Sequence, residues 1–205
     1  MADTYANDLR VRLQEVGANS GTWGGFLNTT VTNIAESLAY GTQASFGSDA
    51  NATTTVADGA ADPARALYFK VTSSGSLTAT RTLTIAPNTI SRVQIIENAT
   101  SGSQIITIKQ GSGAELSIPN GESRMVYYDG AGSGAAVVDA LADINIGGKL
   151  TLGVNDTGFD FTAYGATSGK YLLWDESDDA LVLPDSTNIK IGTGGDLQLY
   201  HDGTN

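Results

Sequence analysis

His201 is the one histidine of the chain and the first residue to consider for chemistry. In a serine hydrolase it would accept the proton of the nucleophile, with Asp196 or Asp202 orienting its ring. The chain has no Gly-x-Ser-x-Gly sequence of the kind that exposes such a serine. His201 stands instead in a Tyr-His-Asp-Gly sequence, which is typical of a turn. We therefore predict that it is a turn residue, or a contact between chains, and that the protein is not an enzyme.

The densest group of carboxylates lies between two short apolar runs and comprises Asp175, Glu176, Asp178 and Asp179. Calcium prefers such oxygen ligands, but the EF-hand spacing and its glycine at the sixth position are missing. A solvated hairpin turn is the better interpretation. Because the chain has no cysteine, disulfides and thiolate metal sites are excluded. We expect neither a metal nor a cofactor.

Two glycine-rich stretches, 111–113 and 192–195, lack the lysine and the following helix of a phosphate-binding loop. Three aromatic residues near the end of the chain could stack on sugars if they are exposed: Tyr171, Trp174 and Tyr200. At strand positions such residues more often pack in a core or between chains, and we favour that interpretation. The sequence leaves both interpretations open.

The charge and hydrophobicity of the chain argue against two classes of partner, nucleic acids and membranes. The 205 residues carry a formal net charge of −11 and no basic cluster, so we expect no nucleic-acid binding. No window approaches 18 apolar residues, and residues 1–5 do not resemble a signal peptide, so we expect no membrane insertion. The 25 glycines favour many short strands joined by tight turns.

The first segment, residues 1–45, contains the one convincing helix. Leu9, Val11 and Leu13 alternate with polar residues, which is strand periodicity, and a short helix is the alternative. A helix is predicted to begin near residues 22–26 and to end at Gly41, with an apolar stripe at helical spacing. The stripe comprises Trp23, Phe26, Leu27, Val31, Ile34 and Leu38. A strand and a helix cannot form a large core, so the stripe should dock on other copies of the chain, on a partner protein, or on the following domain.

Residues 46–64 are rich in Ala, Asp, Asn, Thr and Ser and are predicted to be a linker. Residues 65–143 are predicted to form an all-β, sandwich-like domain, because short runs with period-two alternation are separated by turn sequences. The predicted strands are 66–71, 76–85, 91–98, 104–110, 114–118, 122–128 and 135–141.

Residues 144–205 are predicted to be a shaft of short β-strands. Each run is about four residues long and places only about two side chains on each face. Such hairpins are marginal in water unless they pack on something else. Self-association into a fibre fits that need, and an ordinary β-rich domain is the alternative. Candidate residues for packing between chains are Leu173, Trp174, Leu181, Leu183, Leu197 and Leu199.

Three phrases of the sequence resemble tail-fibre proteins of marine and freshwater bacteriophages, cyanophages among them. The phrases are EVGANSGTWG (15–24), GVNDTGFDFTAYGATSGKYLLWDESDDALVL (153–183) and GDLQLYHDGTN (195–205). The resemblance implies a proximal fibre segment with an N-terminal docking segment, a sandwich-like middle domain and the start of a trimeric β-structured shaft.

The resemblance also implies what the protein does. A homotrimer would attach through its N-terminus to an adaptor, nozzle or baseplate protein of the tail, and would link the virion to a distal tip that binds a host surface receptor. It would be assembled in the bacterial cytoplasm. The six-residue helix stripe is then the expected tail-docking surface. Because the sequence stops inside a turn, we expect a longer fibre. A carbohydrate-binding adhesin module and a polysaccharide depolymerase are the alternatives.

Overall fold

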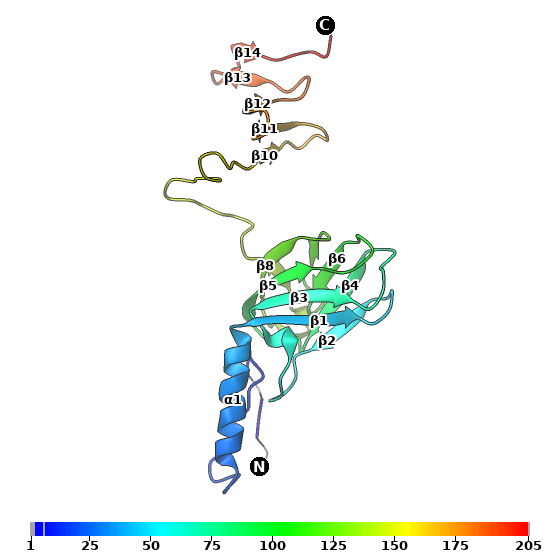
Figure 1. Cartoon of the computed structure of the whole chain (residues 1–205), viewed down its shortest axis with the longest axis vertical. Helices are drawn as coiled ribbons and strands as arrows, with labels where there is room; N and C mark the ends of the chain where they lie inside the picture. Colours follow the sequence, from blue (N-terminus) through cyan, green and yellow to red (C-terminus); the bar gives the residue numbers. More distant parts are fainter. Residues whose placement is uncertain (1–2, 6, 205) are drawn as a thin grey trace. The chain divides into compact units, whose positions relative to one another are not determined.

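The computed structural model describes residues 3–5 and 7–204, which fall into two units, Met1–Ile144 and Asn145–Asn205 (Figure 1). In the described residues of the first unit, a single α-helix is followed by strands in two sheets, and the second unit contains only strands. The expected fold class, mainly β with one helix, is confirmed. The elements of the first unit are α1 (Trp23–Ser37), β1 (Tyr40–Phe46), β2 (Ala52–Thr55), η1 (Pro63–Arg65), β3 (Tyr68–Ser73), β4 (Arg81–Ala86), β5 (Arg92–Asn98), β6 (Ile106–Lys109), β7 (Leu116–Ile118), β8 (Ser123–Tyr128), η2 (Gly132–Gly134) and β9 (Val137–Asp139).

The first six strands of the first unit, β1 to β6, alternate between two sheets. One sheet has the order β1-β3-β5-β8-β9, and the other has the order β2-β4-β6-β7. The chain therefore winds as a coil through one sheet and then the other, and the neighbours β1, β3 and β5 are parallel, as are β2, β4 and β6. Tyr40 pairs with Tyr68, and Tyr68 pairs with Ile95, so the successive turns take 28 and 27 residues. Antiparallel β7, β8 and β9 complete the sheets.

One buried apolar cluster draws on both sheets. It includes Phe69 and Ile96 from the first sheet and Leu83 and Ile108 from the second. Two layers around a shared core match the expected sandwich-like arrangement. The parallel winding was not predicted, because period-two alternation shows that a strand exists but not which strand it pairs with.

The predicted linker 46–64 is corrected by the structure, because its residues belong to the β domain. β2 pairs in parallel with β4, and β1 lies beside β3. Phe46 and Val56 anchor this stretch in the core, each no more than 1% exposed. Small β-branched and polar residues suffice here because the neighbouring strands supply the hydrogen bonds and the two anchors supply the apolar contact.

The predicted strand at Leu9–Leu13 is also corrected. Only an isolated bridge joins Thr4 to Leu13 in the described part of this segment. Arg10 has φ +53°, which interrupts an extended chain, and the Asn7 side chain bonds both the N–H and the C=O of Val11. The segment runs beside α1 without joining a sheet (Figure 1).

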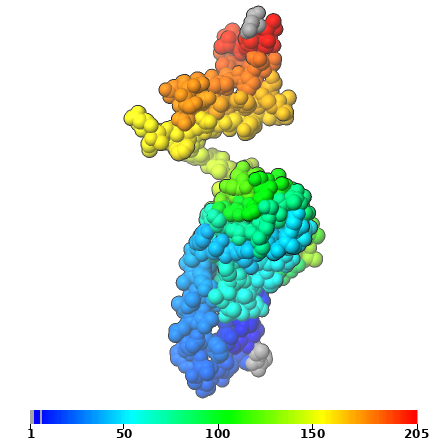
Figure 2. Space-filling model, turned by 45° about the vertical axis from the view of Figure 1, so that its right-hand side comes forward, coloured from blue at the N-terminus to red at the C-terminus, as the bar shows by residue number. Residues whose placement is uncertain are grey.

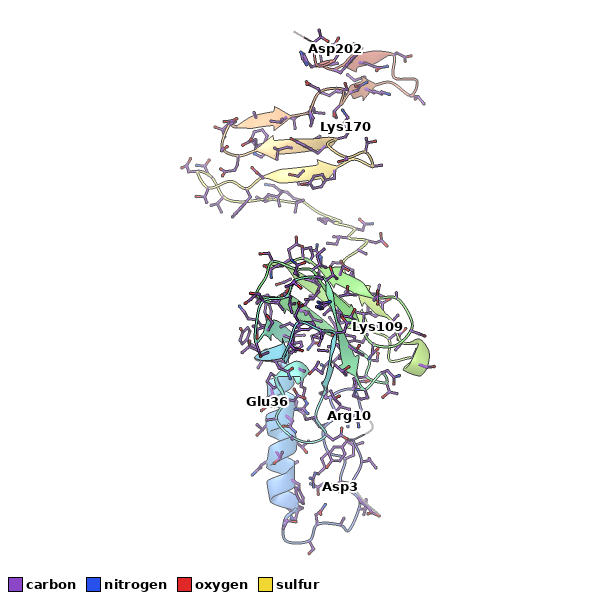
Figure 3. All side chains as sticks on the ribbon, turned by 90° about the vertical axis from the view of Figure 1, so that its right-hand side faces the viewer. Asp3, Arg10, Glu36, Lys109, Lys170 and Asp202 are labelled. Atoms are coloured by element: carbon purple, nitrogen blue, oxygen red, sulfur yellow. The ribbon has the colours of Figure 1, made fainter. Side chains whose placement is uncertain are left out.

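Arg65 fastens α1 and the N-terminal segment to the β domain. The residue is 1% exposed, and its side chain donates to the carbonyl oxygens of Leu9 (2.7 Å), Ala57 (2.5 Å) and Ala60 (2.8 Å). A nitrogen of the same guanidinium lies 3.5 Å from a carboxylate oxygen of Glu36, on the last turn of α1. Glu36 and Arg10 are labelled in Figure 3, where α1 and the N-terminal segment approach the sheets.

Asp49 fastens the turn between β1 and β2. Its carboxylate accepts hydrogen bonds from the Arg81 guanidinium (2.7 Å) and from the Thr78 hydroxyl (2.5 Å). These bonds hold the pKa of Asp49 well below its ordinary value. A depressed folded-state pKa stabilises the fold above the unfolded-state pKa, and this contribution is lost as the pH falls.

Asp49→Asn should therefore lower the stability of the first unit at pH 7. The difference in stability between the variant and the unchanged protein should become smaller as the pH falls from about 5 to below about 4, the unfolded-state pKa of an aspartate. Urea midpoints at pH 7 and pH 3 would check this. A difference of equal size at both values would show that the ionised form of Asp49 has no special role.

The second unit contains two small sheets. β10 (Phe161–Tyr164), β11 (Tyr171–Asp175) and β12 (Ala180–Val182) form an antiparallel sheet, and β13 (Ile189–Ile191) and β14 (Leu197–Leu199) form a hairpin. The unit begins at Asn145, one residue from the expected start of the shaft at residue 144. None of its described residues is buried.

Candidate interaction surfaces

The residues considered first for chemistry serve turn geometry. His201 Nδ1 lies 2.9 Å from a carboxylate oxygen of Asp185 and 3.1 Å from the backbone nitrogen of Gly203. Its acidic neighbour is thus Asp185, and neither Asp196 nor Asp202 takes that place. Both side chains of the pair are exposed. Together with the bond from the Ser186 N–H to the His201 carbonyl oxygen, the pair ties two turns of the second unit together.

The acidic residues between β11 and β12 do not converge on a metal site. Asp175 accepts hydrogen bonds from the N–H and hydroxyl of Ser177 and from the N–H of Asp178. The Ser177 hydroxyl bond lowers the pKa of Asp175. Within residues 3–5 and 7–204, no group of three or more His, Cys, Asp or Glu side chains could hold a metal ion. The cluster forms an Asx-type turn.

The first large apolar surface is on α1. Of the six residues predicted for the helix stripe, five are exposed, among them Val31 at 57% and Leu38 at 73%. The sixth, Phe26, is partly covered because the Arg12 guanidinium lies over its ring, 3.7 Å from the centroid. Phe26 therefore leaves the predicted surface. Figure 2 shows α1 along one side of the first unit with a flank uncovered in that view. We call Trp23, Leu27, Val31, Ile34 and Leu38 the helix stripe from here on.

The second large apolar surface follows from strand register. Residues directly opposite each other on paired strands point to the same face. Trp174 lies opposite Phe161 and Leu181, so these three share one face of the sheet. In the β13–β14 hairpin the same rule gathers four exposed side chains on one face: Ile189, Ile191, Leu197 and Leu199.

Two open hollows are lined by residues of these groups. One is lined by Leu150, Leu152, Phe159, Phe161 and Trp174, together with Gly158. The other runs from the sheet to the hairpin, and its lining includes Leu181, Leu183, Ile189, Leu199 and Tyr200. We call the apolar residues of both hollows, with Ile191 and Leu197, the shaft face.

Five of the six residues expected to pack between chains belong to the shaft face: Trp174, Leu181, Leu183, Leu197 and Leu199. Leu173 does not, because it lies opposite Thr162 and Val182 and so points to the other side of the sheet. Sequence reasoning missed Leu150, Leu152, Phe159, Phe161, Ile189 and Ile191. The alternation of Phe159 and Phe161 was a usable signal, and so was that of Ile189 and Ile191.

Comparisons with protein-family models, with curated proteins and with solved structures found no match to this chain. No helix in the described residues is long and apolar enough to cross a lipid bilayer.

Proposed function

We propose that this chain is the proximal part of a bacteriophage tail fibre, with a structural role and no catalytic one. In this proposal the fibre is a homotrimer in the virion, its N-terminal unit attaches to a protein of the tail, and its shaft leads to a tip that binds a host receptor. The resemblance of three stretches to phage tail fibres motivates the proposal.

The observation that carries the proposal is the exposure of the shaft face. None of the described residues of the second unit is buried, although it contains leucine, isoleucine, phenylalanine and tryptophan side chains in ordered strands. Each fully buried side chain of this type contributes about 1.5–3 kcal/mol. Strands of three to five residues cannot remain ordered without that contribution. Packing against further copies of the same strands would supply it.

The proposal also fits the turn chemistry of the second unit. In a shaft of stacked hairpins each turn must be short and well defined. The Asp175 turn and the pairing of His201 with Asp185 perform this task with local hydrogen bonds. No further role for these residues is needed.

Labelling of phage particles tests the function. Antibodies raised against this chain should label the tails of purified particles of the phage that encodes it, close to the attachment point of the fibres. Labelling should vanish from particles whose gene for this chain is interrupted, and those particles should adsorb poorly to their host. Normal adsorption by fully assembled, unlabelled particles would refute the proposal.

A further inference from the structure

The helix stripe is exposed although the helix does bury another side. The side of α1 that the rest of the unit covers includes Asn33, at 1% exposure, and Ser37. The N-terminal segment reaches α1 through Arg12, whose guanidinium lies over Phe26. Thus α1 buries polar residues within its own chain and leaves its larger apolar side chains in the open, which is the reverse of an ordinary surface helix.

The spacing of the stripe is that of a coiled-coil seam. Leu27, Val31, Ile34 and Leu38 are separated by four, three and four residues, which are the intervals between successive d and a positions of a heptad. Leu27 and Ile34 take d positions, and Val31 and Leu38 take a positions. A seam of this kind is complementary to itself, because each side chain fits between four side chains of an identical neighbouring helix.

The charges around the seam fit contact between identical chains. With this register, the e positions are Asn28 and Ala35, and the g positions are Trp23, Thr30 and Ser37, all uncharged. The one charged residue of α1 is Glu36, at an f position, and Arg65 lies 3.5 Å from it. A chain of net charge −11 would normally repel its copies. At this surface no like charges meet.

We infer that α1 of each copy packs in parallel and in register against α1 of two other copies, with the helix stripe as their shared seam. The inference rests on the proposed fibre and adds to it a second trimer contact, at the N-terminal end. The tail protein then binds the fibre outside the seam, and the helix stripe is not the tail-docking surface that the sequence suggested.

Cysteine cross-linking tests the seam directly, because the chain contains no cysteine of its own. In Val31→Cys, the Cα atoms of residue 31 in two neighbouring copies should lie about 4.4–6.8 Å apart, which is the separation that a disulfide requires. Thr29→Cys is the matched control, because Thr29 is exposed and takes an f position on the outside of the bundle. Both variants are made in the full chain and oxidised at micromolar concentration.

The expected result is a linked pair of chains from most of the Val31→Cys protein and almost none from Thr29→Cys, in gels run without reductant. One chain of each trimer has no partner for its thiol and stays single.

If light scattering shows three chains but Val31→Cys does not link, or both variants link equally, the seam is refuted and the proposed trimer stands. If the chain is a monomer, the seam and the trimer both fail. Leu27→Cys, at a d position, repeats the test should Val31→Cys fold poorly.

Discussion

Trp174→Asp should shift the dissociation of the three chains to a much higher protein concentration while leaving the first unit folded. Trp174 is at the centre of the shaft face, between Phe161 and Leu181 on the neighbouring strands. Loss of its burial removes about 2 kcal/mol or more per chain. The carboxylate that replaces it would be buried without a partner, which costs several kcal/mol more. A total of about 4 kcal/mol per chain corresponds to roughly a thousandfold in association at each site.

Thr162→Asp is the matched control for this prediction. Thr162 is exposed on β10, in the same sheet, and its side chain points to the face opposite to Trp174 because it pairs with Leu173. The same charge there should leave the mass at three chains. The molar mass reports whether the chains dissociate, and the melting curve reports whether the first unit stays folded. Equal dissociation by both variants, or by neither, would show that the shaft face is not the contact between chains.

Arg65→Ala should strongly destabilise the first unit. It leaves the carbonyl oxygens of Leu9, Ala57 and Ala60 without their donor and removes the ionic contact with Glu36. The three hydrogen bonds are part-buried, and a hydrogen bond from a charged donor contributes about 1.5–3 kcal/mol. We expect a loss of about 3–5 kcal/mol in the free energy of unfolding, measured by denaturant titration.

Arg124→Ala provides the comparison. Arg124 also forms an ion pair, with Glu122 at 2.6 Å, but both side chains are more than 40% exposed. An exposed pair contributes about 0–1 kcal/mol. If Arg65→Ala proved no more harmful than Arg124→Ala, the role assigned to Arg65 in holding α1 and the N-terminal segment would be wrong.

Local patterns predicted the elements well where each pattern reports a local property. Each of the seven strands predicted between residues 65 and 143 has an observed counterpart, from β3 to β9. The helix was expected to begin between Thr22 and Phe26, and it begins at Trp23. Its predicted end at Gly41 was wrong, because α1 ends at Ser37 and Gly41 lies in β1. Apolar residues recur with period two in strands and period 3.6 in helices because one face of each element is buried. This pattern can be recognised in a single sequence.

Pairing between distant strands could not be predicted in the same way. Nothing in Tyr40 or Tyr68 alone indicates that they are parallel neighbours, because that depends on where the whole intervening turn of the coil places them. β2 was mistaken for linker because Ala52–Thr55 has no large apolar residue, and its place depends on hydrogen bonds to β4.

The candidate surfaces show the same division. The stripe on α1 was visible in the sequence, but Phe26 was wrongly included in it. Arg12 covers the Phe26 ring, and helical spacing cannot show where the segment that carries Arg12 lies. Leu173 was assigned to the packing surface as a large apolar residue. Its direction depends on the register with Thr162 and Val182, which only the structure supplies.

The molar mass of the full chain in solution tests the central claim most directly. Light scattering on a folded sample at micromolar concentration should give three times the 21.1 kDa of one chain. The mass should hold on moderate dilution, because apolar side chains of the shaft face would be covered by the neighbouring copies. A mass of 21.1 kDa with a cooperative melting transition of the second unit would contradict the proposal. It would mean that these short strands are stable with their apolar face in water.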